Sequence, residues 1–354
     1  MMATINNSSL IKFYFKIVVF FAIMIAVIGC KDKIKKVSDL DVKSDSSKSN
    51  YSGELRAVTF LPYWVANAQF AGYYIAVEKG IYEKYGMKVN IIPFHPFVTS
   101  TDLIKEGKAD FAALWLVNAI ELQASGADIV NIAQPSFRSS LMLVTKKKSG
   151  INTLQDMNGK KAGIWDGFEF QPKALFNKYH LDVKIIPIGS TNSLFLRDGV
   201  DITNANWFDE YHSIINSGYN ANELNTFFFA DYGMNFLEDG IYCLSDKLKK
   251  DPKLCADFIN ATFEGWLYAF NNREEVVDIV VRNAIKDKLP VNRAHQRWML
   301  DRYKDLYFPE GMKAIHTNLS RNDYEFVSNI LKESGLIKQI TPYEKFFQPV
   351  LNVP

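Results

Sequence analysis

Four tryptophans with polar neighbours suggest a ligand site: they are Trp64, Trp115, Trp165 and Trp207. The polar residues near them are Asn67, Gln69, Asn118, Glu121, Asp166, Glu169, Asn206, Asp209 and Glu210, and Tyr211 follows the last of these. Indole faces stack on flat rings, at about 0.5–1.5 kcal/mol per contact beyond area burial. The set therefore predicts a slot for a flat heteroaromatic solute. The groups expected to read the polar edge of that solute are Asn67, Asn118, Glu169 and Glu210, because amides and carboxylates pair with amino groups and ring nitrogens.

Strand and helix patterns alternate through the first two thirds of the chain, which predicts an α/β fold with parallel sheets. Each of the four tryptophans falls within a few residues of the carboxyl end of a predicted strand, the edge where open α/β sheets bind ligands. These strands are expected at 55–61, 110–114, 161–164 and 201–203. Any one of the tryptophans could instead pack in a core. The repetition of the pattern four times favours a shared cleft.

The chain beyond Leu244 has a mostly helical pattern. Apolar residues recur at every fourth position in Leu254, Phe258, Thr262, Trp266 and Phe270. Such a stripe is typical of a helix face that packs in a core. Trp266, and Trp298 in a later helical segment, are therefore expected to be core residues and not ligand residues.

The first thirty residues have the pattern of an export signal. Lys12 and Lys16 precede an apolar run from Ile17 to Gly29, which is shorter than the roughly twenty residues of a membrane span. The run ends at Cys30 in the pattern at which bacterial lipoproteins are cleaved and lipidated. We expect a signal peptide at 1–29, then a lipidated Cys30 and a charged, serine-rich tether at 30–52, which is too polar to fold by itself. An uncleaved membrane anchor is the alternative.

Composition excludes several classes of function. Lys and Arg number 41 against 39 Asp and Glu, so there is no electrostatic basis for nucleic-acid binding. The five histidines show no paired ligand spacing, and no metal is expected. Cys243 and Cys255 match no metal or redox motif, which leaves buried free thiols or a disulfide between them.

Several segments resemble the thiamine-precursor and sulfonate group of ABC-transporter substrate-binding proteins. They include LPYWVANAQFAGYYIAVEKGIYEKYGMKV, KEGKADFAALWLVNAIELQASGADIVNIA, NGKKAGIW, and GVDITNANWFDEYHSIINSGYNANEL through FLEDGIY. The resemblance implies a periplasmic-binding-protein-like fold of type 2, with two doubly wound α/β lobes and a two-strand hinge. Lobe 1 would comprise 53–142 and 241–354, and lobe 2 would comprise 143–240. The strands Leu141–Thr145 and Ile241–Leu244 would cross between the lobes.

The same resemblance implies the partners. A monomer held outside the cytoplasm by its lipid would deliver a solute to an ABC permease and its ATPase, with no cofactor. The W-x-x-N opening and the Asp209-Glu210-Tyr211 segment resemble the pyrimidine and flavin binders of the group more than the sulfonate binders. An extracellular sensor module is a further alternative and would need a separate signalling partner.

The group is related to an enzyme, thiamine pyrimidine synthase. Enzymes of this type hold pyridoxal phosphate with a lysine and consume a histidine that lies four residues after it, so the resemblance implies that an active chain would need both residues. This chain has Leu114 and Asn118 at those positions, and only Cys243 where the synthase has a run of cysteines. Leucine cannot form an imine, so we expect no enzymatic activity.

An anion-binding alternative rests on the segment Gly189–Ser193. It precedes a predicted helix and could offer backbone N–H groups to a sulfonate or phosphate. An ordinary Ser/Thr helix cap explains the same residues.

Overall fold

Two five-stranded mixed sheets form the framework of the part of the chain that the structure describes. This structure is a computed structural model and describes residues 51–94, 100–189, 191–308 and 315–351, all within one compact unit. The predicted signal peptide, Cys30 and nearly all of the tether lie outside the described residues. The first sheet has the order β2-β1-β3-β10-β4, and the second has the order β7-β6-β8-β5-β9.

The strands of the first sheet are β1 (Arg56–Leu61), β2 (Met87–Ile91), β3 (Phe111–Leu114), β4 (Ile129–Ala133) and β10 (Gly240–Leu244). Those of the second are β5 (Leu141–Lys146), β6 (Lys161–Trp165), β7 (Lys184–Ile188), β8 (Ile202–Asn206) and β9 (Leu224–Phe228). We call the first sheet with its helices lobe 1 and the second sheet with its helices lobe 2.

Each sheet contains an antiparallel strand, which corrects the expectation of purely parallel sheets. β1 is parallel to β2 and β3, whereas β10 is antiparallel to β3 and β4. Likewise β6 is parallel to β7 and β8, whereas β5 is antiparallel to β8 and β9. β5 and β10 are the first strands after the chain crosses from one sheet to the other, so they enter the new sheet in the opposite direction. The predicted boundary between the lobes, after residue 142, falls inside β5. We propose instead that the chain passes from one lobe to the other in the connecting segments 134–140 and 229–239.

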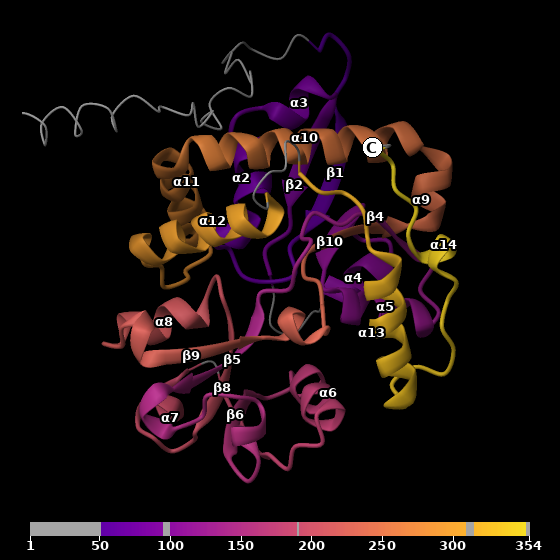
Figure 1. Ribbon diagram of the computed structural model, residues 1–354. Helices are drawn as coiled ribbons and strands as arrows, with labels where there is room; N and C mark the ends of the chain where they lie inside the picture. Colours follow the sequence, from indigo (N-terminus) through magenta and orange to yellow (C-terminus); the bar gives the residue numbers. More distant parts are fainter. Residues whose placement is uncertain (1–50, 95–99, 190, 309–314, 352–354) are drawn as a thin grey trace, which may run out of the picture. The chain divides into compact units, whose positions relative to one another are not determined.

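Helices follow most strands, as the alternating pattern predicts (Figure 1). Those in the first part of the chain are η3 (Ala68–Phe70), α2 (Ala71–Glu78), α3 (Ile81–Lys84), α4 (Ser100–Lys105) and α5 (Leu116–Ala124). Between β5 and β10 lie η4 (Lys147–Ser149), η5 (Gln155–Met157), α6 (Phe170–Lys178), α7 (Ser193–Leu196), α8 (Glu210–Asn216), η6 (Ala221–Glu223) and η7 (Phe229–Tyr232). The helical end comprises α9 (Ser245–Lys250), α10 (Pro252–Asn271), α11 (Arg273–Lys286), α12 (Arg293–Tyr307), α13 (Arg321–Glu333) and α14 (Tyr343–Phe346).

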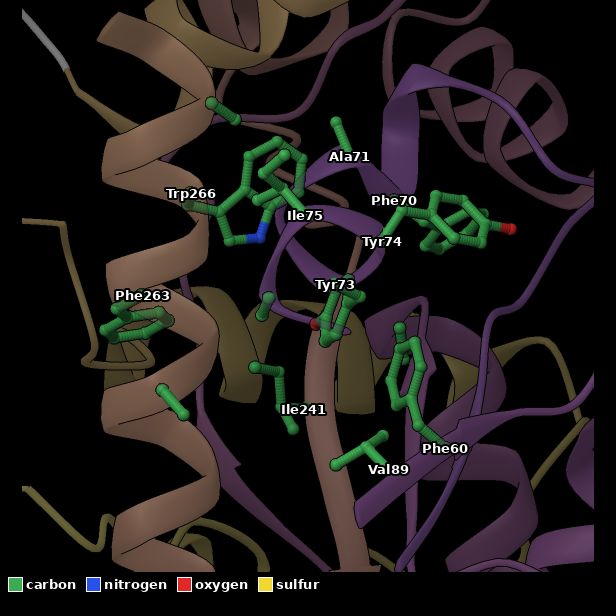
Figure 2. Packing of buried hydrophobic residues seen from close by; sticks show 14 of the residues in the cluster. Phe60, Phe70, Ala71, Tyr73, Tyr74, Ile75, Val89, Ile241, Phe263 and Trp266 are labelled. Atoms are coloured by element: carbon green, nitrogen blue, oxygen red, sulfur yellow. The ribbon is translucent and has the colours of Figure 1, made fainter. Parts of the chain in front are cut away.

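The core of lobe 1 is built where α2 packs on α10 (Figure 2). Trp266 of α10 is fully buried, as expected from the helical stripe, and stacks on Tyr303 at a centroid distance of 5.7 Å. Gly72 of α2 allows the close approach, because a Cβ there would lie 2.4 Å from the Trp266 ring. Tyr73 of the same helix stacks on Phe60 of β1 at 3.9 Å. This packing fixes the loop between β1 and α2 relative to the sheet.

The described residues contain no candidate membrane-spanning helix and no candidate metal site. No helix there combines the length and apolarity that crossing a bilayer requires. Within the same residues, no group of three or more His, Cys, Asp and Glu side chains is arranged to hold a metal ion. Cys243 and Cys255 are both buried and unpaired.

Candidate functional site

A cavity of about 230 Å³ is lined by residues from both lobes. Lobe 1 contributes Tyr63, Trp64, Gln69 and Trp115, and lobe 2 contributes Trp165, Asp166, Phe168, Ile188, Gly189, Asn206, Phe208, Asp209 and Glu210. Six of these thirteen residues are aromatic, so nearly half of the lining residues are of a kind that stacks on a flat ring. The polar groups come largely from the ends of β8 and α8. The cavity is thus an aromatic slot with one polar side.

The lobe 1 wall is formed by loops at the carboxyl ends of β1 and β3. Trp115 directly follows β3 and is the N-cap residue of α5, with 8% of its surface exposed. Its ring lies 5.8 Å from that of Tyr63, which follows β1. Burial, with a smaller effect of Glu121, raises the pKa of Tyr63 to about 12, so its phenol stays protonated. Trp64 is 40% exposed and contacts Phe94 at 5.1 Å, which places it at the rim.

Phe168 connects the aromatic groups of the two lobes. It follows Trp165, the last residue of β6, and meets that ring edge-on at 5.9 Å and 89°. Phe168 also meets Trp115 of lobe 1 edge-on, at 5.7 Å and 63°. The backbone N–H of Trp165 donates to Oδ1 of Asn204, which helps to hold the end of the strand. A ring entering this slot would therefore contact both lobes.

Glu210 is the polar group whose environment is most altered. Its Oε2 accepts a hydrogen bond of 2.9 Å from the backbone N–H of Asn206. Burial, followed by the nearby Asp209 carboxylate, raises the pKa of Glu210 to about 8. The side chain is therefore mostly protonated at neutral pH. A neutral carboxyl group can donate to a ring nitrogen and accept from an adjacent amino group.

Polar groups of the slot are hydrogen-bonded to buried acids in the connecting segments. Nε2 of Gln69 donates to Oδ1 of Asp239 at 2.9 Å, and the Tyr303 hydroxyl donates to the same carboxylate at 2.6 Å. Glu238 accepts from the Ser139 hydroxyl at 2.8 Å and from the Ser140 N–H at 3.0 Å. Burial raises the pKa of Glu238 to about 8 and that of Asp239 to about 6. These bonds link the cavity wall to the point where the chain passes between the lobes.

Of the residues proposed from the sequence as ligand contacts, six line this cavity: Trp64, Gln69, Trp115, Trp165, Asp166 and Glu210. Asn118 and Glu169 line a neighbouring cavity of about 610 Å³, which shares Tyr63, Trp115 and Phe168 with the first. The structure thus places eight of the proposed residues around two adjoining spaces.

Asn67, Trp207 and Tyr211 do not line either cavity. Asn67 is buried, and its Oδ1 caps η3 by accepting a hydrogen bond of 2.9 Å from the Gln69 backbone N–H. Trp207 turns away from the slot, with the Arg302 guanidinium 4.8 Å above its ring and Phe228 packed edge-on against it. Tyr211 packs in the core of lobe 2, 6.3 Å from the ring of Trp298. Trp298 itself, expected in the core, is only partly buried and donates from Nε1 to the Trp207 carbonyl at 3.0 Å.

Four lining residues had no predicted role in the site: Tyr63, Phe168, Ile188 and Phe208. Asn206 and Asp209 were predicted only as polar neighbours of the tryptophans, and Gly189 only as part of the anion-binding alternative. Tyr63 and Phe168 lie beside predicted tryptophans, so the rule that placed Trp64 and Trp165 at strand ends could have included them. Phe208 is 2% exposed and carries no feature that distinguishes it from a core residue.

The segment proposed for anion binding has little of the required geometry. The helix that follows it, α7, is only four residues long and begins at Ser193. Ser190 lies outside the described residues. The Asn192 side chain is directed to the protein, where its Nδ2 donates to the Glu210 carbonyl at 3.4 Å. Gly189 lines the aromatic cavity instead.

The chain is similar to curated proteins of two kinds. It is 23% identical to the 4-amino-5-hydroxymethyl-2-methylpyrimidine phosphate synthase of Legionella pneumophila, over 63% of this chain and 72% of that protein. It is 30% identical to the synthase of the same name from Schizosaccharomyces pombe, but this match spans only 35% of this chain and 36% of that protein. It is 23% identical to the riboflavin-binding protein RibY of Chloroflexus aurantiacus, over 65% of this chain and 67% of that protein.

Solved structures of binding proteins share the fold. The periplasmic aliphatic sulphonate binding protein SsuA of Escherichia coli matches with a TM-score of 0.65 and 15% identity, over 84% of this chain and 93% of that one. At this identity the match shows the two-lobed periplasmic-binding fold alone. The family model described as NMT1/THI5 like matches residues 67–276, more than half of the chain. Because the match covers more than half of the chain, the chain belongs to the NMT1/THI5-like family.

Proposed function

We propose that this protein is the solute-binding component of an ABC importer and captures a small heteroaromatic solute, a thiamine pyrimidine precursor or a flavin. The observation that carries the proposal is the slot in which Trp115 of lobe 1 and Trp165 of lobe 2 both contact Phe168. The names of the synthases and of the riboflavin-binding protein are consistent with such a ligand.

Capture follows from the two-lobe architecture. A solute shifts an equilibrium between open and closed lobes only through its differential affinity for the two states. A ring between Trp115 and Trp165 contacts both walls only when the lobes are together. Closure would then present a surface to a permease, and an ATPase would drive release.

The protein is proposed to bind and not to catalyse. Leu114, at the position of the cofactor lysine in the resemblance to the synthases, is completely buried at the end of β3 among apolar side chains. Asn118, at the position of the consumed histidine, lines the larger cavity. Neither side chain can form an imine or serve as the imidazole that the synthases consume.

Attachment outside the cytoplasm through lipidated Cys30 is part of the same proposal. It is supported by the signal pattern that ends at this cysteine. A Cys30→Ala variant should not incorporate labelled palmitate in cells. Incorporation equal to that of the unchanged protein would refute lipidation at Cys30.

The proposal is tested on the full-length protein purified in detergent. Native mass spectrometry should reveal a bound aromatic solute, and calorimetry should detect binding of 4-amino-5-hydroxymethyl-2-methylpyrimidine or riboflavin but not of taurine. Incubation with iron and pyridoxal phosphate should yield no pyrimidine phosphate. Binding of taurine alone would favour the anion alternative, and product formation would show that the chain is an enzyme.

A further inference from the structure

A second cavity adjoins the aromatic slot and has a different chemical character. It measures about 610 Å³ and shares Tyr63, Trp115 and Phe168 with the slot. Its other lining residues are Val117, Asn118, Glu121, Gly167, Glu169, Phe170, Gln171, Lys173, Ala174, Asn177, Ser334 and Leu336. Both lobes contribute to it, so a ligand that occupied both cavities would span the same interface.

The sizes of the two cavities indicate that a ligand filling both would have a smaller part and a larger part. Pockets for drug-sized ligands measure about 300–1,000 Å³. The slot alone, at about 230 Å³, falls below that range and has room for a ring system with small substituents. The adjoining space is more than twice as large and would accommodate a substituent carried by the ring.

Several polar side chains that line the second cavity have no partner among the described residues. Gln171 is the clearest case, because it is only 5% exposed and its side-chain amide makes no hydrogen bond with another described residue. The side chains of Asn118, Glu121 and Lys173 likewise have no hydrogen-bond or ion-pair partner among the described residues. The Gln171 amide is therefore free to donate to and accept from a ligand group that enters the cavity.

The second cavity has amides and more acidic than basic groups. Its amides, Asn118, Gln171 and Asn177, each donate and accept, as hydroxyl groups do. Its charged lining residues are two carboxylates, Glu121 and Glu169, and one cation, Lys173. Two carboxylates would repel a phosphate, since like charges at close range are unfavourable. The lining therefore matches an uncharged chain of hydroxyl groups better than an anionic one.

The Trp115 indole lies in the shared wall of the two spaces. It is 8% exposed, and its Nε1–H has no acceptor among the described residues. This Nε1 atom is itself buried within the wall, so Trp115 presents its ring surface, and not this donor, to the two cavities.

We infer that the second cavity binds an uncharged polyhydroxylated chain attached to the ring held in the aromatic slot. The inference rests on the proposed function and narrows it from heteroaromatic solutes in general to a ring with a sugar-alcohol-like substituent. A bare pyrimidine would leave the larger cavity, with Gln171 in it, unused.

The test uses three flavin probes that share the isoalloxazine ring and differ only in the substituent on N10. Riboflavin carries a ribityl chain, lumiflavin carries a methyl group, and flavin mononucleotide carries a phosphorylated ribityl chain. Fluorescence quenching with the full-length protein should give an affinity for riboflavin at least about tenfold above the affinities for the other two. Gln171→Ala should weaken riboflavin binding about fivefold, the value of one hydrogen bond, and leave lumiflavin binding unchanged. Gln155→Ala, on the exposed η5 of the same lobe, is the matched control and should change neither.

The outcomes separate the inference from the proposed function. Equal affinity for riboflavin and lumiflavin, or tighter binding of flavin mononucleotide, would overturn the inference. Binding of 4-amino-5-hydroxymethyl-2-methylpyrimidine but no flavin, with loss in Trp165→Ala, would also overturn it and leave the proposed function standing. Binding of none of the four probes would contradict both.

Discussion

Glu210 gives the aromatic slot a group that titrates near neutral pH. Its raised pKa comes from burial and from the adjacent Asp209 carboxylate. In the neutral form it offers an O–H to a ring nitrogen, while its carbonyl oxygen accepts from an amino group. In the ionised form it can only accept. Recognition of an aminopyrimidine edge by this residue should therefore depend on its proton.

Affinity for 4-amino-5-hydroxymethyl-2-methylpyrimidine should fall as pH rises through about 8. The folded-state pKa lies above the ordinary value, so the proton that favours binding is present below 8 and is lost above it. Glu210→Gln, which keeps a donor and an acceptor at all pH values, should flatten the profile between pH 6 and 9.5. Calorimetric titration across this range measures both. An unchanged slope in Glu210→Gln would show that another group controls the dependence.

Single residues could be predicted where their position along a strand decided their location. Trp64 and Trp115 lie just after strand ends and Trp165 is the last residue of β6, and the rule that ligands bind at that edge placed all three at the cavity. Trp207 follows β8 in the same way but turns to Arg302 and Phe228, because residues far away in the sequence supply a competing aromatic and cationic surface. No local pattern reports such a partner. The role of these residues in binding remains a prediction.

At the scale of elements, the α2–α10 interface depends on the absence of a side chain. A Cβ on Gly72 would lie 2.4 Å from the Trp266 ring, and one on Gly265 would lie 2.2 Å from the Gly72 carbonyl oxygen. Both contacts are shorter than van der Waals separation. The two helices can approach only because each has a glycine where they cross.

Gly72→Ala should destabilise the protein, although alanine favours helices by about 1 kcal/mol over glycine. Overpacking against Trp266 should cost about 1–3 kcal/mol, with a larger loss of about 3–5 kcal/mol for Trp266→Ala, which opens a cavity. Val77→Ala, on the exposed side of α2, is the control and should change stability by less than about 0.5 kcal/mol. Urea denaturation measures all three. A Gly72→Ala variant as stable as the unchanged protein would show that the helices can separate freely.

Helix α8 of lobe 2 packs against helix α12 of lobe 1 beside the cavity. Oδ1 of Asp209 lies 2.9 Å from Nε2 of His295, whose Nδ1 lies 2.9 Å from Nδ1 of His212. The His212 ring stacks on Trp298 at 4.8 Å. Two Nδ1 atoms can share a hydrogen bond only if one of them is unprotonated. Burial, then His295 and Arg302, lowers the pKa of His212, while Asp209 raises it.

Acidification should weaken this contact between the lobes. The pKa of His212 is lowered below its ordinary value of 6.5 in this arrangement. The contact therefore stabilises the protein fully at pH values above 6.5, and this stabilisation is lost as the pH falls through the lowered pKa. Small-angle scattering should therefore show the ligand-free protein expanding between pH 7.5 and 5. His212→Phe keeps the ring on Trp298 but cannot titrate, and it should remove the change. Expansion of equal size in this variant would assign the effect to other groups.

The elements themselves were largely predictable, whereas their connections were less so. The alternating strands and helices could be predicted because the spacing of apolar residues and the turn residues between segments are visible within a short stretch of sequence. The antiparallel β5 and β10 could not, because their direction is set by where the chain crosses between sheets. That crossing depends on contacts such as Gln69 with Asp239, which are 170 residues apart.

At the scale of the whole molecule, the buried acids Glu238 and Asp239 join the cavity to the crossings. Asp239 accepts a hydrogen bond from Nε2 of Gln69 in the lobe 1 wall. Glu238 accepts one from the backbone N–H of Ser140, whose hydroxyl donates to Oδ1 of Asn206 at 3.1 Å. Polar groups from both walls thus meet in the same connecting segments. We propose that a solute which rearranges Gln69 or Asn206 also changes the preferred angle of the hinge.

The central claim is that one flat solute is held between the two lobes. The most direct test is the affinity of Trp115→Ala and Trp165→Ala for riboflavin and 4-amino-5-hydroxymethyl-2-methylpyrimidine, with Trp207→Ala as a control outside the cavity. Both cavity variants should lose about tenfold or more for the same solute, because each removes a stacking face, and Trp207→Ala should stay within about twofold. Loss of affinity in only one cavity variant, or a larger loss in Trp207→Ala than in both, would contradict binding between the lobes.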